Sequence, residues 1–270
     1  MILEKTLELI LRIYRYHKIL PPQISRVVVG LGYTGVELAA YAYEPFLGVA
    51  QTLSSVIHNT DCSKINFAGE LTDLSFTELI TWSLEPVSLR KTIGVATLNA
   101  ASQHILAVRN PYVELKEQLI DYLNINEKTR INFIGFIAPI VKAINRITKN
   151  ITIVDDNPIS KTLSNEFNIK SNIDQLNEQE LKVDILICTG TSILNDTLEH
   201  ILSIFKKNAN YIIVVGPTIS FIPDILFDYG VNIVGGMKIL NSEATLKILQ
   251  EGGGTRIFKK YGRKYYFIKS

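Results

Sequence analysis

The stretch INFIGFIAPIVKAINRITKNITIVDD, residues 131–156, decides the fold. It consists of an apolar run over 131–136, a segment at helical spacing over 138–148 and a second apolar run over 151–156. Continuous Val, Ile and Leu runs are typical of strands that are buried on both faces of a parallel sheet. Pro139 suits the first turn of the intervening helix, where the amides have no partner inside the helix. The stretch therefore predicts a strand–helix–strand unit.

The same alternation continues towards the C-terminus. Further strands are expected over 183–190, 211–216 and 231–236, with helices over 158–167, 192–207 and 219–229. Strand–helix alternation at this spacing predicts right-handed crossovers and a doubly wound parallel sheet. The polar stretch NINEKTR (124–130) is suited to a linker, so we expect a Rossmann-like ligand-binding domain over residues 126–270.

The first half of the chain shows a different pattern. Apolar residues at helical spacing over 2–19 precede Pro21 and Pro22, and residues 26–45 form two strand-like runs around a glycine-rich turn. Helices are expected over 74–84, 88–108 and 111–123. Strands followed by a block of helices predict an α+β domain over residues 1–125.

Composition excludes several classes of protein. The 270 residues are 47% hydrophobic and 20% charged, with a net charge of +2, so no overall field attracts nucleic acid or anionic lipid. Glu4, Lys5 and Glu8 interrupt the start where an export signal needs an apolar stretch, and no later apolar run of bilayer length lacks charge or proline. Cys62 and Cys188 make no disulfide framework. We expect a cytoplasmic protein with no membrane or nucleic-acid partner; a homodimer is compatible with this composition.

The motif GLGYTG (30–35) matches the G-x-G-x-x-G pattern of dinucleotide sites. That pattern also requires a following helix and an acidic residue about twenty positions on. Pro45 breaks the following segment, and LGVAQTLSSV has no acidic residue. A glycine-rich hairpin turn is therefore the preferred interpretation.

The strand ends of the second half offer a better candidate. Gly135 ends the first strand, exposed amides are expected near Pro139, and Asp155 follows at the end of the second strand, where a ribose-binding carboxylate lies in such folds. Two further loops lead to the same edge of a parallel sheet and contain the ligand-binding candidates Thr189, Gly190, Thr191, Gly216, Pro217 and Thr218. Helix caps and ordinary turns are the alternative explanation for these residues.

Three glycines in succession, Gly252, Gly253 and Gly254, follow a predicted helix. One glycine suffices for a helix C-cap, so three indicate close approach of the backbone to a ligand or to the other domain. A flexible exit loop is the alternative.

Metal ligation has one sequence candidate, His58 and Cys62 in HNTDC, with Asp61 between them. Imidazole and thiolate suit zinc, copper or cobalt, but two ligands do not close a site. Cys188 ends a buried strand and is expected in the core.

The basic and aromatic residues of 256–270 fit a strand pair with a solvated face better than a nucleic-acid site. No Ser-His-Asp set with a nucleophile elbow is present, so no catalytic residue is assigned.

The runs GLGYTGVEL, LGVAQTL and IGVATLNAASQ, followed by GFIAPIV, CTGTSILNDTL, VVGPTISFIPDILFDYGVNIVGG and EGGGT, resemble the heavy-metal chelation family over nearly the whole chain. The resemblance implies an enolase-N-terminal-like α+β domain before a Rossmann-like domain, with an active site in the cleft between them. It also implies a link to metal chelation in anaerobic cobalamin synthesis, and it places Thr97, Asn99 and Gln103 on the cleft. Asn99 and Gln103 could equally form a polar stripe on an amphipathic helix.

Two functions follow as hypotheses. The first is a metal- or metallo-ligand-handling protein with a small-ligand site in the inter-domain cleft. The second is a transferase that binds a nucleotide-like cosubstrate, such as S-adenosylmethionine, across Gly135–Pro139 and Asp155. A non-catalytic binding module is a third, weaker idea.

Overall fold

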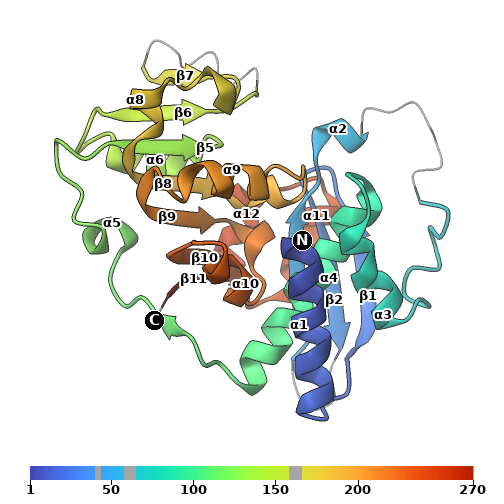
Figure 1. The fold of residues 1–270 in the computed structure, drawn as a ribbon. Helices are drawn as coiled ribbons and strands as arrows, with labels where there is room; N and C mark the ends of the chain where they lie inside the picture. The colour runs from blue at the N-terminus through green and yellow to red at the C-terminus, as the bar shows by residue number, and fades with distance from the viewer. Residues whose placement is uncertain (40–43, 58–64, 158–165, 270) are drawn as a thin grey trace.

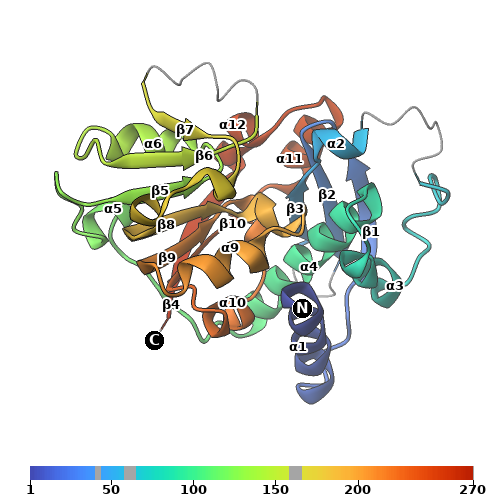
Figure 2. The same ribbon diagram turned by 45° about the horizontal axis from the view of Figure 1, so that its top comes forward.

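The computed structural model describes residues 1–39, 44–57, 65–157 and 166–269 and contains two β-sheets. A small antiparallel sheet belongs to the N-terminal half, and a mixed, mostly parallel sheet belongs to the C-terminal half. Helices α1 and α4 lie at the junction between them (Figure 1, Figure 2). The α/β class predicted from the sequence is confirmed.

The small sheet is a meander of β1 (Gln23–Val29), β2 (Tyr33–Ala39) and β3 (Phe46–Gln51). Val29 pairs with Thr34 across the turn, so GLGYTG forms a hairpin turn as predicted. The sequence pattern does not predict β3, because Gly48 in its interior weakens the strand signal. The helices of this half are α1 (Ile2–Tyr16), α2 (Ser54–Ile57), α3 (Phe76–Thr81), the 3₁₀ helix η1 (Trp82–Leu84) and α4 (Leu89–Val108).

The large sheet has the order β4-β11-β10-β9-β8-β5-β6-β7. Its strands are β4 (Val113–Glu114), β5 (Ile131–Ile134), β6 (Ile151–Val154), β7 (Asn168–Lys170), β8 (Val183–Thr189), β9 (Ala209–Val215), β10 (Ile233–Ile239) and β11 (Gly262–Ile268). The six strands from β5 to β10 are parallel, and in chain order they are arranged 3-2-1-4-5-6, which is the Rossmann order. The Rossmann-like prediction is therefore confirmed.

Short helices connect these strands. They are α5 (Leu119–Tyr122), α6 (Ala138–Ile144), η2 (Ile173–Gln175), α8 (Glu178–Leu181), η3 (Gly190–Ile193), α9 (Leu198–Phe205), η4 (Pro217–Ile219), α10 (Asp224–Asp228), α11 (Ser242–Gln250), α12 (Thr255–Phe258) and η5 (Lys259–Tyr261). Among the described residues, every helix is too short or too polar to span a bilayer.

Three expectations about the segments that form or flank the large sheet need correction. The helix predicted over 111–123 is wrong, because Val113 and Glu114 pair with β11 and only α5 is helical. The helix predicted over 192–207 begins at Leu198, after η3 and a turn in which Asp196 has φ +60°. The sheet is not wholly parallel, because β11 inserts antiparallel between β10 and β4. The helix predicted over 158–167 lies mostly outside the described residues.

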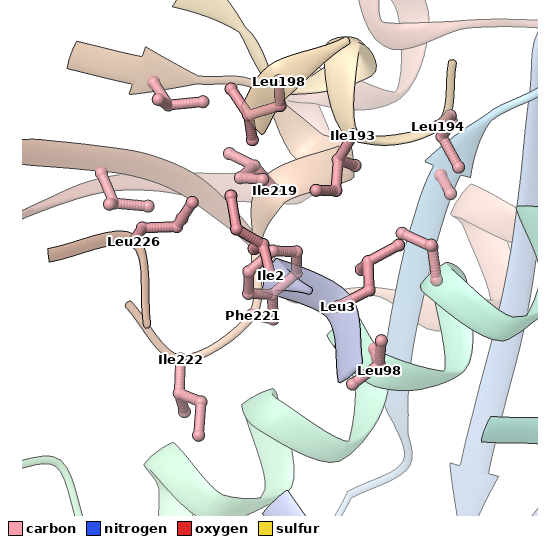
Figure 3. Packing of buried hydrophobic residues seen from close by; sticks show 14 of the residues in the cluster. Ile2, Leu3, Leu98, Ile193, Leu194, Leu198, Ile219, Phe221, Ile222 and Leu226 are labelled. Carbon is pink, nitrogen blue, oxygen red and sulfur yellow. The ribbon is translucent and has the colours of Figure 1, made fainter. Parts of the chain in front are cut away.

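Helix α4 is buried on every side, because every residue from 91 to 105 is buried. One hydrophobic cluster runs from the N-terminal half into the C-terminal half. Figure 3 shows Ile2 and Leu3 of α1 beside Leu98 of α4 and Phe221 of the C-terminal half. The two halves thus share one core, which favours a fixed arrangement over a freely moving cleft. The domain boundary near residue 125 remains a prediction.

Backbone contact makes the packing of α4 possible. A Cβ on Gly48 of β3 would overlap the Ala96 carbonyl oxygen and the Ala100 amide of α4. A Cβ on Gly94 would likewise overlap the Ser83 amide of η1. Strand and helix backbones therefore touch directly, which only glycine permits.

We predict that Gly48→Ala lowers the free energy of unfolding by about 3 kcal/mol or more, because backbone atoms have no room to shift. Gly254→Ala is the matched control. Its Cβ would meet only the Tyr33 ring, at 3.8 Å, so it should cost less than about 1 kcal/mol. Urea unfolding of both variants measures the difference, and equal stabilities would contradict the direct strand–helix contact.

Candidate functional site at the junction of the two sheets

The switch point of the parallel sheet lies between β5 and β8, where the chain order reverses. Gly135, just after β5, has φ +86°, and a Cβ there would lie 2.7 Å from Thr189 Cγ2 at the end of β8. The Thr189 methyl group thus packs directly against Gly135. Only a residue without a side chain fits at 135, for both steric and conformational reasons.

The loop after β9 joins the same edge. Gly216 has φ +133° and donates its amide to the Gly235 carbonyl oxygen at 2.9 Å. A Cβ on Gly190 would lie 2.7 Å from Ile219 Cβ, so η3 and η4 pack closely. The loops after β5, β8 and β9 therefore meet, as the sequence predicts for the carboxyl edge of a parallel sheet.

The small sheet contributes Gln51, the last residue of β3, to this edge. The Thr191 hydroxyl donates to Gln51 Oε1 at 2.6 Å, and the backbone amide of Gln51 donates to Thr218 Oγ1 at 3.1 Å. Thr189, Thr191 and Gln51 are all half-buried, so their polar atoms lie near solvent. Gln51 could not be predicted from the sequence, because nothing near the end of its apolar run indicates a contact with a residue 140 positions away.

Asn99 and Gln103 of α4 reach the same loop from inside the protein. Asn99 Nδ2 donates to the carbonyl oxygens of Val49 at 2.9 Å and Thr218 at 3.0 Å, and lies 3.3 Å from that of Pro217. Gln103 Nε2 donates to Ser220 O at 3.0 Å and is 3.1 Å from the Tyr265 hydroxyl. These amide groups hold η4 in place. The amphipathic-stripe alternative is wrong, because α4 has no exposed face between residues 91 and 105.

Thr97, the third residue of that predicted set, bonds within its own helix. Its hydroxyl donates to the Ile93 carbonyl oxygen at 2.9 Å, and the residue is fully buried. This is the usual arrangement of a threonine inside a helix.

Asp155 follows β6 directly, at the end of the second strand of the Rossmann order. Its carboxylate accepts the Phe136 amide at 2.5 Å and the Asn157 amide at 2.8 Å. The side chain therefore supports the loop after β5. Pro139 lies exposed at the start of α6.

The loop after β5 departs from the dinucleotide fingerprint. Counting from Gly135 as the first glycine, the second and third glycine positions are Ile137 and Ile140. The second glycine of the fingerprint exists so that the backbone can approach a pyrophosphate. An isoleucine there disfavours a dinucleotide and leaves smaller nucleotide-like ligands as the alternative.

Gly252, Gly253 and Gly254 pack against the β1–β2 turn of the other half. Gly252 has φ +79° and a Cβ there would lie 3.4 Å from Leu31 Cδ1, while a Cβ on Gly32 would lie 3.2 Å from Gly253 O. The close backbone approach expected from the sequence is thus made to the N-terminal half. Alanine at Gly253 would overlap Ile248 of the preceding helix, so that substitution cannot leave the fold untouched.

Soft metal donors are scattered in the described part of the chain. Cys188 is fully buried, 3.3 Å from Ser192 Oγ, and burial raises the pKa of its thiol to about 12. His104 Nδ1 lies 3.0 Å from the Tyr14 hydroxyl, and burial lowers the pKa of its imidazole. Nowhere among the described residues do three or more His, Cys, Asp or Glu side chains come together as a metal site. The predicted ligands His58 and Cys62 lie outside the described residues.

The arrangement defines a class of two-sheet α/β protein in which a Rossmann sheet edge is completed by a second, antiparallel sheet. Residues 118–268 match the model of a family described as "Putative heavy-metal chelation", and residues 17–102 match a second model with the same description. The chain belongs to this family.

Similar proteins agree with this assignment. An uncharacterised protein of Methanocaldococcus jannaschii is 29% identical over 183 residues, an alignment that covers 66% of this chain and 65% of that relative. A crystal structure of a protein of unknown function from Pyrococcus horikoshii matches with a TM-score of 0.75 at 23% identity, over the full length of both chains. Another from Desulfitobacterium hafniense, also of unknown function, has a TM-score of 0.70 at 16% identity, covering 97% of this chain and 100% of its own. At these identities the structures establish the fold alone.

We predict that Asn99→Leu lowers the free energy of unfolding by about 2–3 kcal/mol, because it leaves buried carbonyl oxygens without donors. Thr97→Val is the matched control on the same helix, where only a local side-chain bond is lost, at a cost below about 1 kcal/mol. Chemical denaturation distinguishes them. Equal losses would show that Asn99 does not tie η4 to α4.

Proposed function

We propose that this chain handles a metal-containing small ligand at the junction of the two sheets. The observation that carries the proposal is the convergence of three strand-end loops at the switch point, bridged to the small sheet by the bond between Thr191 and Gln51. Open α/β sheets bind ligands at the carboxyl ends of their strands, next to such a switch point. Family membership supports metal as the cargo.

The polar atoms best placed for the ligand are on the half-buried rim. Thr189, Thr191 and Gln51 offer hydroxyl and amide groups, and Gly216 leaves room for the ligand beside the backbone. Asn99 and Gln103 are not expected to contact the ligand, since both donate their side-chain amide hydrogens to protein groups in and around the η4 loop. Their role in this proposal is to position the rim.

Thiolate and imidazole are the side-chain ligands that suit zinc, copper or cobalt. Cys188 does not fit this role, because a thiol with a pKa of about 12 stays protonated at neutral pH and this one is fully buried. His58 and Cys62 are the residues that we propose for metal contact, with the small ligand filling other coordination positions. The link to cobalamin synthesis implied by the resemblance would make the metal cobalt and the ligand a corrinoid precursor.

Titration with Co²⁺ tests this proposal, using the two cysteines as a matched pair. Cys62→Ala should weaken Co²⁺ binding by about tenfold or more, because a thiolate ligand is lost. Cys188→Ala should bind Co²⁺ like the wild type at any pH up to about 9, well below the pKa of its thiol. Identical binding by the wild type and both variants would overturn the assignment of Cys62, and absence of binding to the wild type would overturn metal handling.

A second candidate function is a transferase with a nucleotide-like cosubstrate, and the position of Asp155 favours it. The residue lies at the end of the second Rossmann strand, beside the loop after β5, where ribose hydroxyls are bound in folds of this type. Ile137 argues for a ligand without a pyrophosphate, such as adenosine or S-adenosylmethionine.

Calorimetric titration with adenosine, S-adenosylmethionine and NAD tests this second function. Asp155→Ala should lose about 1.5–3 kcal/mol of binding free energy for adenosine-containing ligands, which is the range for a hydrogen bond to a charged group. Asp156→Ala, at the exposed neighbouring position, is the control and should bind normally. Unchanged affinity in the Asp155 variant would remove this carboxylate from the site, and a thermal melt checks that the loop is still folded.

A further inference from the structure

Gln51 lies between two of the strand-end loops at the sheet edge. Its backbone amide donates to Thr218 Oγ1 in the loop after β9, and its side chain accepts from Thr191 in the loop after β8. Both loops belong to the C-terminal half, whereas Gln51 ends β3 of the small sheet. The Gln51 side chain is therefore held at the junction of the two sheets by bonds to both loops.

The hydrogen bonds that lead to Gln51 run in one direction. Thr189 Oγ1 accepts the Thr191 amide at 3.4 Å, and its own hydrogen is donated to Thr191 Oγ1 at 3.3 Å. A hydroxyl has a single hydrogen, and Thr191 donates its hydrogen to Gln51 Oε1 at 2.6 Å. The carbonyl end of the Gln51 side-chain amide therefore faces Thr191, and the NH₂ end faces away from it.

The NH₂ group of Gln51 is not used within the protein. No group among the described residues accepts a hydrogen from Gln51 Nε2. This nitrogen is also not among the buried side-chain atoms that lack a hydrogen-bond partner, so it is open to solvent. A side-chain amide nitrogen has two hydrogens to donate. Gln51 can therefore donate to a ligand at this edge.

Two backbone amides at the same edge already donate within the protein. Gly135 donates to the Val154 carbonyl oxygen at 2.8 Å, and Gly216 donates to the Gly235 carbonyl oxygen at 2.9 Å. These two amides are thus not available to a phosphate group, which successive free backbone amides would bind. A neutral side-chain donor such as Gln51 instead suits an oxygen acceptor, of the carboxylate or carboxamide type.

We propose that Gln51 determines which metal-containing ligand the sheet edge accepts, by donating from Nε2 to an oxygen acceptor on the outside of the ligand. A ligand covered with carboxylate or carboxamide oxygens satisfies this donor, whereas a ligand covered with N–H groups places donor against donor. Thr189 and Thr191 are positioning residues, because they fix the direction of the Gln51 amide. This inference rests on the proposed metal-ligand function and adds the chemistry of the ligand surface.

Two inert cobalt(III) complexes test the inference in calorimetric titrations of the full chain. The ethylenediaminetetraacetate complex presents carboxylate oxygens, and the tris(ethylenediamine) complex presents N–H groups. The wild type should bind the first complex at least about tenfold more tightly than the second, because only the first satisfies the Gln51 donor. Failure to bind the first complex, or equal binding of both, would overturn the assignment of an oxygen acceptor.

Gln51→Glu locates the effect. Glutamate keeps an oxygen for the Thr191 hydroxyl but replaces the NH₂ donor by a second acceptor, so binding of the ethylenediaminetetraacetate complex should fall by about tenfold or more. Gln179→Glu is the matched control, because it makes the same change of charge at an exposed position on α8 and should bind the complex like the wild type. Equal losses in both variants, or no loss in Gln51→Glu, would overturn the role of Gln51. The two variants should have the same Tm, because the backbone bond to Thr218 is untouched.

Titration with Co²⁺ separates this result from the proposed function. The metal ion in both complexes has no free coordination position, so their binding reports the outside of the ligand alone. A wild type that binds Co²⁺ but not the ethylenediaminetetraacetate complex would retain metal handling and contradict the Gln51 inference. A wild type that binds this complex through Gln51 but does not bind Co²⁺ would contradict metal contact by the protein and support the Gln51 inference.

Discussion

Helix α4 has no solvent-facing side over fifteen consecutive residues, and the two halves of the chain meet around it. The small sheet approaches it backbone to backbone at Gly48, and η1 does the same at Gly94. Helix α1 and the segment around Phe221 join it in one continuous apolar cluster. Apolar burial is the main favourable term in folding, so separating the halves would expose the central core of both.

Burial of α4 also determines where polar chemistry can occur. Any polar side chain on such a helix must find its partner inside the protein or in a bound molecule. Asn99 and Gln103 find carbonyl oxygens of the η4 loop and fix the sheet edge from beneath. Lys91, near the start of the helix, pairs with Asp196 of the other half. The same helix therefore supports the candidate site from inside the protein.

The elements that could be predicted from the sequence are those marked by an apolar run or a turn residue within the element itself. The strands over 131–136 and 183–190 are continuous apolar runs, and the hairpin of β1 and β2 has glycines at its turn, so both could be predicted from the local sequence. Strand β4 could not, because Val113 and Glu114 become a strand only by pairing with residues more than 150 positions later.

The candidate site likewise contains residues whose position follows from the strand pattern and residues whose position depends on contacts between distant segments. Convergence of Gly135, Thr189 and Gly216 follows from parallel topology and was predicted. The roles of Asn99 and Gln51 depend on which loop folds against them, and the burial of Lys91 depends on the contact between the two halves. No local pattern encodes those contacts.

Cooperativity of unfolding tests the shared core most directly. Trp82 is the single tryptophan and packs in the N-terminal part of the cluster, so its fluorescence reports that half. Far-UV circular dichroism reports the whole chain, including the large sheet. In urea, one core shared around α4 predicts coincident transitions by both signals. A Trp82 transition at clearly lower urea, with the remaining secondary structure intact, would contradict a core shared by both halves and show two independently folded domains.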